Sequence, residues 1–201
     1  EHLPKWIDKQ DLVVKPDQPI VGKKNVFRVK NEKEFKKAFK LAAEESFNGF
    51  VECQKFEQGI DIGLVVATLN GKIIWNFLFE EIVDEKDGNF IGKGVRAPAK
   101  EIGEDIHKKI IESAEKVIGS LKPSGFIFFS YRLIEPNIFK LYEINPGLCG
   151  DNIVDVLFKK IWPDCNFYEF DVKLATNFLP NLPDTSNLIE AEHIVNNQIE
   201  Y

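Results

Sequence analysis

The chain has 201 residues, of which 44% are hydrophobic and 29% are charged, with a formal net charge of -6. This length suits one large domain or two small lobes with a buried core. The acidic balance disfavours a nucleic-acid partner, whose phosphates select basic surfaces. No apolar run reaches the roughly 20 residues that a membrane helix requires, so we expect no membrane association.

The three cysteines, Cys53, Cys149 and Cys165, are widely spaced and odd in number. This pattern disfavours a disulfide framework and favours reduced thiols in a cytoplasmic protein. No Cys/His spacing is typical of a zinc site. The sequence contains no methionine, even at its first position, so we expect the chain to be a processed or excised piece of a longer protein.

Short β-rich runs in the first third of the chain predict three strands. They are residues 12–15, 26–29 and 50–54. Asn31 followed by Glu34 forms a capping-box pattern, which predicts a helix that begins there and runs to about Glu45. We expect Phe35, Ala38, Phe39 and Ala42 to lie on one face of this helix.

Hairpins and helices alternate in the rest of the chain. The pair Asn70-Gly71 is a strong hairpin signal between strands at 60–68 and 72–79, and the polar stretch 80–98 predicts a mobile loop. We then expect a helix at 102–121, a hairpin of 125–134 with 138–144, and a helix at 151–162. The apolar stripe of the helix at 102–121 consists of Ile106, Ile110, Ile111, Ala114, Val117 and Ile118. This order predicts an α+β fold with largely antiparallel sheets.

Glu143 and Asn145 lie two residues apart near the end of a predicted strand, just before Pro146-Gly147. Alternate residues of a strand point to the same face. Carboxylate and amide oxygens suit a hard cation such as Mg²⁺. The alternative is a solvent-facing polar pair, which for two such residues considered alone is the commoner case.

Four other positions could contact a nucleotide. Lys15 ends an apolar strand, where its charge is costly to desolvate unless it meets an anion, although it could instead extend to solvent. Gly22-Lys23 could lay backbone N–H groups and a lysine over phosphates, without the spacing of a Walker A loop. Glu52 and Asp61 flank a glycine turn and could accept hydrogen bonds from ribose hydroxyls, or be surface acids.

The order of these features resembles the ATP-grasp superfamily over about residues 6–158. Within it the chain looks most similar to phosphoribosylamine–glycine ligase. The likeness rests on residues 6–15 with Gly22-Lys23, on residues 125–143, and on Gly150-Asp151. The resemblance implies two α+β lobes with largely antiparallel sheets that grip a nucleotide. The small lobe would span residues 1–57 and the large lobe, with the metal site, 58–179, followed by a peripheral tail at 180–201.

The resemblance also implies an ADP-forming ligase that joins a small-molecule carboxylate to an amine through an acyl phosphate, with ATP and Mg²⁺ (or Mn²⁺) bound. An upstream substrate domain would precede this piece in the full-length protein. The implied nucleotide contacts are Lys15 at the α-phosphate, Gly22 and Lys23 over the other phosphates, and Glu52 and Asp61 near adenine and ribose. Glu143 and Asn145 would bind the metal, and the candidate catalytic cations are Lys15, Lys23 and Arg96.

Three positions depart from the family pattern. Lys24 replaces a loop glycine, Ser130 stands where many relatives carry an acid, and Gly147 stands where many carry arginine. These departures leave open a second interpretation, a nucleotide-binding module with reduced catalysis. A third interpretation is a ligase similar to acyl-CoA synthetases and ATP-citrate lyase, which residues 12–18 also resemble, although Gly150-Asp151 fits it less well.

Overall fold

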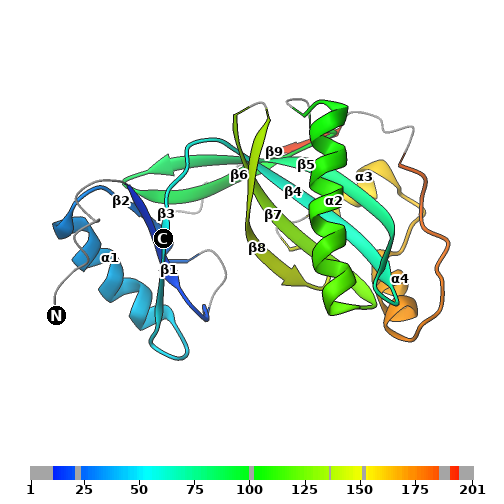
Figure 1. The fold of residues 1–201 in the computed structure, drawn as a ribbon, viewed down its shortest axis with the longest axis horizontal. Coiled ribbons are helices and arrows are strands. Elements are labelled where there is room, and N and C mark those ends of the chain that lie inside the picture. Colours follow the sequence, from blue (N-terminus) through cyan, green and yellow to red (C-terminus); the bar gives the residue numbers. More distant parts are fainter. Residues whose placement is uncertain are drawn as a thin grey trace. The chain divides into compact units, whose positions relative to one another are not determined.

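The computed structural model describes residues 11–20, 24–99, 102–135, 137–150 and 153–185, and the backbone of 191–194. The strands are β1 (Leu12–Pro16), β2 (Phe27–Val29), β3 (Val51–Lys55), β4 (Ile60–Leu69), β5 (Lys72–Lys86), β6 (Asn89–Ala97), β7 (Gly125–Glu135), β8 (Ile138–Pro146) and β9 (Ala191–Ile194). The helices are α1 (Glu32–Glu45), α2 (Glu104–Leu121), the π-helix η2 (Ile153–Phe158), α3 (Lys159–Ile161) and α4 (Phe167–Ala175). The strand order is β3-β1-β2-β6-β5-β4-β7-β8, and β9 pairs with β6 (Figure 1).

The chain divides into two compact units. Unit 1 comprises Glu1–Glu57 and Val83–Gly92, and unit 2 comprises Gln58–Ile82 and Lys93–Tyr201. Compared with the lobes expected from the sequence, the segment Val83–Gly92 joins the smaller unit, and residues 180–201 join the larger one. The expected α+β class is confirmed, and the strand pairs whose register is defined are antiparallel.

Unit 1 packs α1 against one face of its strands. The predicted N-cap is present, because Asn31 Oδ1 accepts a hydrogen bond from the backbone N–H of Glu34 at 3.0 Å. The Glu34 carboxylate reaches back to the backbone N–H of Lys30 instead of that of Asn31, so the capping box differs from the standard pattern. The core beneath α1 consists of Leu12, Val14, Val29, Phe35, Ala38 and Ala42. Phe39, expected on the same face as these helix residues, lies beside the ring of Phe35 but is 43% exposed.

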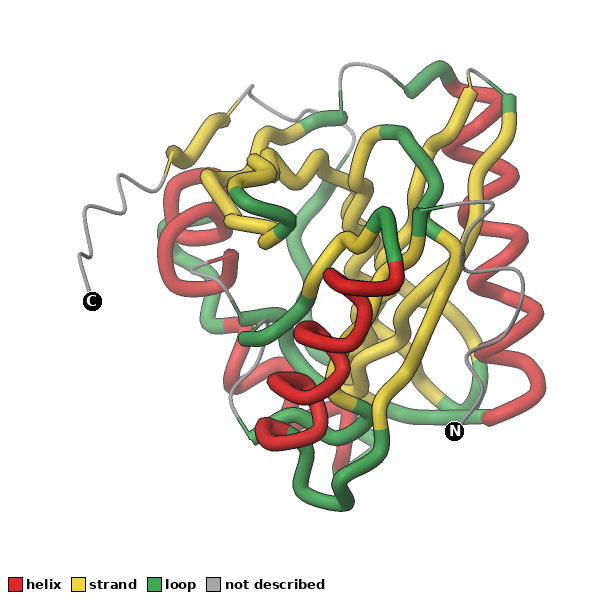
Figure 2. The backbone as a smooth tube through the Cα atoms, turned by 90° about the vertical axis from the view of Figure 1, so that its left-hand side faces the viewer, coloured by secondary structure: helices red, strands yellow, loops and turns green. Residues whose placement is uncertain are grey.

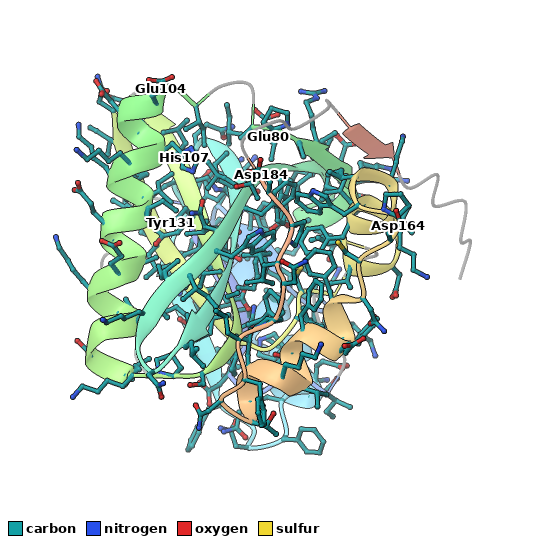
Figure 3. The ribbon with its side chains drawn as sticks, turned by 90° about the vertical axis from the view of Figure 1, so that its right-hand side faces the viewer. Glu80, Glu104, His107, Tyr131, Asp164 and Asp184 are labelled. Atoms are coloured by element: carbon teal, nitrogen blue, oxygen red, sulfur yellow. The ribbon has the colours of Figure 1, made fainter. Side chains whose placement is uncertain are left out.

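Unit 2 has a core on each face of its strands. Helix α2 covers one face (Figure 2), with Ile106, Ile110, Ala114 and Ile118 fully buried against β4 and β7. The opposite face packs against η2, α3 and α4, which Figure 3 shows on the other side of the strands from α2. This second core is strongly aromatic, and its members include Trp75, Phe77, Phe79, Phe126, Phe158 and Phe167.

The expected mobile loop at 80–98 is wrong, because this stretch continues β5 to Lys86 and returns as β6. Asp87 and Gly88 turn the chain with φ of 53° and 77°, which are the left-handed angles of a tight hairpin turn. Asp-Gly is itself a hairpin signal, but the many charges around it hide the strand pattern. The helix expected at 151–162 is present over 153–161, and most of it is a π-helix.

The described part of the tail, which we expected to be peripheral, packs onto unit 2. The indole nitrogen of Trp75 donates to the carbonyl oxygen of Pro183 at 2.8 Å, and that of Trp162 donates to Asp184 O at 3.3 Å. Strand β9 then pairs antiparallel with β6. Among the described helices, none is long and apolar enough to cross a membrane.

Candidate functional site

Lys15 and Glu52 are direct partners across the β1–β3 ladder of unit 1. Lys15 Nζ lies 3.2 Å from Glu52 Oε2, and the two side chains are 18% and 41% exposed. Leu12 and Val14 are buried beneath α1, so strand alternation directs Lys15 to the opposite face of the sheet. This face therefore presents a partly desolvated lysine, and the Glu52 side of its ion pair remains open to solvent.

Arg28 lies on the same face of unit 1 and holds its segments together. Its guanidinium pairs with Asp11 and, at 2.8 Å, with Glu85 Oε2. The guanidinium carbon also lies 3.9 Å from the centre of the Phe56 ring, which stacks on Phe90. The tip of the β5–β6 hairpin is thus tied to β1 and β2, a role for Arg28 that sequence reasoning missed.

The loop between β1 and β2 is described only in part. Gly22 and Lys23, expected to lie over phosphates, are outside the described residues. Lys24, which follows them, forms an ion pair of 2.8 Å with Glu45 at the end of α1. The Glu45 side chain is only 8% exposed, so Lys24 satisfies a buried carboxylate in this structure.

In unit 2, Asp61 is the centre of a buried polar network on the sheet face opposite α2. Arg132 Nε lies 2.8 Å from Asp61 Oδ1, and the Tyr142 hydroxyl donates to the same oxygen at 3.3 Å. Glu81 is the direct partner of Asp61 on β5. Burial, and then the charges of Asp61 and Glu81, raise the pKa of Tyr142 well above its ordinary value. Asp61 is 8% exposed, so its carboxylate mainly contacts residues of its own sheet.

Glu143 and Asn145 lie on this same face, near the end of β8. Ser130 pairs with Glu143 and Phe128 with Asn145, and Phe128 packs against the aromatic core opposite α2. A bulge at this point makes Tyr142 an extra residue in β8, because Tyr131 pairs with Leu141. Leu141 therefore faces α2, whereas Glu143, two residues later, faces the other way.

The exposed pair fits a hard cation that keeps other ligands. Glu143 and Asn145 are both exposed and offer carboxylate and amide oxygens from one face. Within the described ranges, no group of three or more His, Cys, Asp or Glu side chains could hold a metal. Two oxygen ligands suit Mg²⁺, which usually retains waters and takes oxygens from substrate phosphates.

No protein-family model matches the sequence, and no curated protein matches it in sequence. Solved structures do match. Biotin carboxylase from Campylobacter jejuni is 19% identical over 89% of this chain and 39% of its own, with a TM-score of 0.68. N5-carboxyaminoimidazole ribonucleotide synthetase from Thermotoga maritima is 23% identical over 90% of this chain and 43% of its own, with a TM-score of 0.61. Phosphoribosylglycinamide synthetase from Anaerococcus prevotii is 15% identical over 85% and 41%, with a TM-score of 0.55.

The chain has the ATP-grasp fold. The architecture expected from the sequence is therefore confirmed. The expected glycinamide ligase is among the similar structures, and biotin carboxylase superposes with a higher TM-score. The chain spans about two fifths of the length of each of these proteins.

The structure shows the surroundings of two residues that depart from the ATP-grasp pattern, Ser130 and Gly147. Ser130, opposite Glu143, is only 2% exposed, and its hydroxyl bonds to Tyr142 instead of reaching solvent. Gly147 adopts φ of +102°, and its N–H donates to the carbonyl oxygen of Phe126 at 2.7 Å. A side chain at Gly147 would be strained, so the backbone here differs from that of a strand residue which carries arginine.

Arg96, the third candidate cation, lies on the opposite face of unit 2 from Glu143. Its strand neighbours Val95 and Ala97 belong to the aromatic core, so Arg96 points toward the α2 side. There its Nη1 lies 3.2 Å from Oε2 of Glu80, a carboxylate whose side chain is only 5% exposed (labelled in Figure 3). Lys93, two residues before Val95, shares the face of Glu143 by the same alternation.

Arg132 and Tyr142 are the residues of this face that sequence reasoning missed. Tyr142 adjoins Glu143 in the sequence, but only the register of the bulged β7–β8 hairpin reveals that its hydroxyl reaches Asp61. Arg132 is brought opposite Asp61 by a pairing 71 residues away in sequence, and no local pattern indicates it.

Proposed function

We propose that this chain is the ATP-binding portion of an ADP-forming ligase that joins a small-molecule carboxylate to an amine through an acyl phosphate. The observation that carries the proposal is the exposed pair Glu143 and Asn145, on one face of an ATP-grasp sheet. Similar structures are described with β,γ-ATP for biotin carboxylase, and with MgADP and bicarbonate for the biotin carboxylase domain of Hydrogenobacter thermophilus 2-oxoglutarate carboxylase.

Each residue in the proposal has a defined task. Lys15 holds a nucleotide phosphate, and Glu52 restrains the lysine and accepts a hydrogen bond from the nucleoside. Glu143 and Asn145 hold Mg²⁺ or Mn²⁺. A cation held there would supply neutralisation of the phosphate charge during attack by a carboxylate. Gly22 and Lys23 remain the proposed phosphate loop.

The proposed roles of Asp61 and Arg96 differ from those expected from the sequence. Asp61 positions Arg132 and Tyr142 beside Glu143, so we propose that it acts on the metal-binding strand and not on the ribose. Arg96 neutralises Glu80 on the other face, so we propose Lys93 as the better-placed cation for phosphoryl transfer. The carboxylate and amine sites require an upstream substrate domain in the full-length protein.

A module with reduced catalysis is the second candidate. Buried Ser130 opposite Glu143 favours it, because a serine hydroxyl bonded to Tyr142 is a poor ligand for a second cation. Such a module binds ATP but transfers no phosphoryl group.

Trapping the intermediate distinguishes the two functions. The full-length protein is incubated with ATP, Mg²⁺, hydroxylamine and a panel of small carboxylates, because hydroxylamine converts an acyl phosphate into a stable hydroxamate. The ligase proposal expects hydroxamate with at least one acid and its loss in Glu143→Gln. Glu135→Gln, an exposed acid on the same hairpin, is the matched control. The ligase proposal would be overturned in favour of the module if the protein binds ATP but forms no hydroxamate with any acid and releases no ADP with any pair of acid and amine.

A further inference from the structure

Unit 1 contains a cavity of about 410 Å³ that no part of the proposed reaction uses. Its walls are one side of α1, strand β2 and the tip of the β5–β6 hairpin. Its accessible apolar surface comes mainly from the half-buried Phe27 and Leu41, because Val29 and Ala38, also in the lining, are buried in the core beneath α1. The volume lies in the range of small-molecule pockets, which combine an apolar lining with a few polar groups.

The charged groups at this cavity differ in how fully they are engaged. Arg28 is paired with Asp11 and Glu85. The Glu34 carboxylate accepts hydrogen bonds from the backbone N–H of Lys30 and the side chain of Asn31, both at 2.8 Å. Arg28 is thus held by carboxylates of the protein itself, whereas Glu34 is held by neutral donors.

Two lysines at the cavity have no such engagement. The ammonium groups of Lys30 and Lys37 form no ion pair with any residue that the structure describes. One carboxylate, that of Asp87 in the hairpin turn, is likewise without an ion pair among those residues. The hydrogen-bond donors to Glu34 are neutral, so its carboxylate keeps its negative charge. Among the described residues, the cavity charges outside ion pairs are therefore two positive groups, Lys30 and Lys37, and two negative groups, Glu34 and Asp87.

The cavity is distinct from the Lys15–Glu52 pair. Phe27, Val29 and Ala38 belong to or pack against the core beneath α1, whereas Lys15 points away from α1. Neither Lys15 nor Glu52 lines the cavity, so the two sites share no residue of that pair.

We propose that this cavity binds a small organic anion with an apolar body, whose carboxylate or phosphate group contacts Lys30 and Lys37. The apolar body covers Phe27 and Leu41, and burial of that surface supplies affinity that a bare inorganic anion lacks. Asp87 and the hydrogen-bonded Glu34 oppose the anion and so limit its affinity.

The test is a titration of the chain, labelled with ¹⁵N, with phenylacetate, phenyl phosphate, inorganic phosphate and benzyl alcohol. We expect one or both phenyl anions to shift the amide signals of Val29, Ala38 and Leu41. Inorganic phosphate and benzyl alcohol should bind at least tenfold more weakly. The arm that binds more tightly identifies a carboxylate or a phosphate as the preferred head group.

Three variants at the cavity should change the affinity for the anion in opposite directions. Lys30→Gln and Lys37→Gln should each weaken binding about tenfold, because each removes a charge-assisted contact. Asp87→Asn should strengthen it about twofold, and asparagine tolerates the left-handed turn angle at this position. Lys33→Gln, an exposed lysine of α1 outside the cavity lining, should leave affinity unchanged.

The proposal is overturned if neither phenyl anion binds at millimolar concentration. It is equally overturned if signals shift elsewhere only, or if the double variant Lys30→Gln/Lys37→Gln binds as tightly as the unaltered chain. Because the readout requires no nucleotide, its failure leaves the proposed ligase function untouched.

Discussion

The ammonium nitrogen of Lys15 lies 3.2 Å from the carboxylate of Glu52, and the two residues are direct partners in the β1–β3 ladder. Sequence reasoning selected each residue separately, from segments 37 positions apart. The ladder brings them together on the face of unit 1 opposite α1, where Lys15 is largely but not fully shielded from water.

Replacing Lys15 should weaken ATP binding. We expect Lys15→Met to raise the dissociation constant for ATP about tenfold or more, because a partly buried lysine gives a strong charge-assisted contact to phosphate. Calorimetric titration measures the change. Lys55→Met is the control, since Lys55 is an exposed residue of β3 that pairs with Glu57. Equal affinities for the two variants would remove Lys15 from the site.

Arg96 should contribute to stability more than to catalysis. Removing it in Arg96→Ala takes a charged partner from Glu80, whose side chain is 5% exposed, so we expect a loss of about 2 to 3 kcal/mol in unfolding free energy. Urea denaturation measures this loss, with Lys72→Ala at an exposed strand position as the control. Unchanged stability combined with lost ATP turnover would instead support the catalytic role first expected for Arg96.

Tyr142 should make the stability of unit 2 depend on alkaline pH. Burial, followed by Asp61 and Glu81, raises the pKa of the folded-state hydroxyl above the ordinary value of 10.0. Its contribution is therefore fully present below pH 10 and is lost as the pH rises above it, since ionisation then favours the unfolded chain.

Comparison with Tyr142→Phe isolates this effect. Near pH 8 the unaltered chain should be more stable by about 1 kcal/mol, the net value of a buried hydrogen bond. Above pH 10 that advantage should shrink by about 1.4 kcal/mol per pH unit. A difference that stays constant from pH 8 to pH 11 would contradict the buried, protonated state of Tyr142.

The hairpin turn at Gly88 should tolerate no side chain. Gly88 adopts φ of +77°, and a Cβ there would lie 2.7 Å from the carbonyl oxygen of Arg28. We expect Gly88→Ala to destabilise unit 1 by about 1 to 3 kcal/mol. Gly92→Ala is the control, because no atom lies within 4 Å of its added Cβ. Urea denaturation of both variants tests the difference, and equal stabilities would contradict it.

Local signals explain what could be predicted. Asn31 with Glu34 predicted the start of α1, Asn70-Gly71 predicted the β4–β5 turn, and the apolar stripe predicted the buried face of α2. Each depends on residues only a few positions apart. The order of these elements carried enough information to identify the ATP-grasp fold.

Contacts that depend on register could not be predicted. The bulge at Tyr142 reverses the face on which Glu143 and Asn145 lie relative to Leu141, and periodicity alone puts all three on one side. A charged residue such as Arg96 is expected to face solvent, but strand alternation directs it toward Glu80. Both outcomes follow from pairing between distant strands, which no local pattern specifies.

The most direct test of the account is ATP binding by the full-length protein with and without Mg²⁺, measured by calorimetry for the unaltered protein, Glu143→Gln and Glu135→Gln. We predict that Mg²⁺ strengthens ATP binding at least tenfold in the unaltered protein and in Glu135→Gln, and that Glu143→Gln loses most of this gain, because its neutral amide is a weaker metal ligand. ATP affinity that is absent, or that responds to Mg²⁺ equally in all three proteins, would contradict a nucleotide and metal site at Glu143 and Asn145.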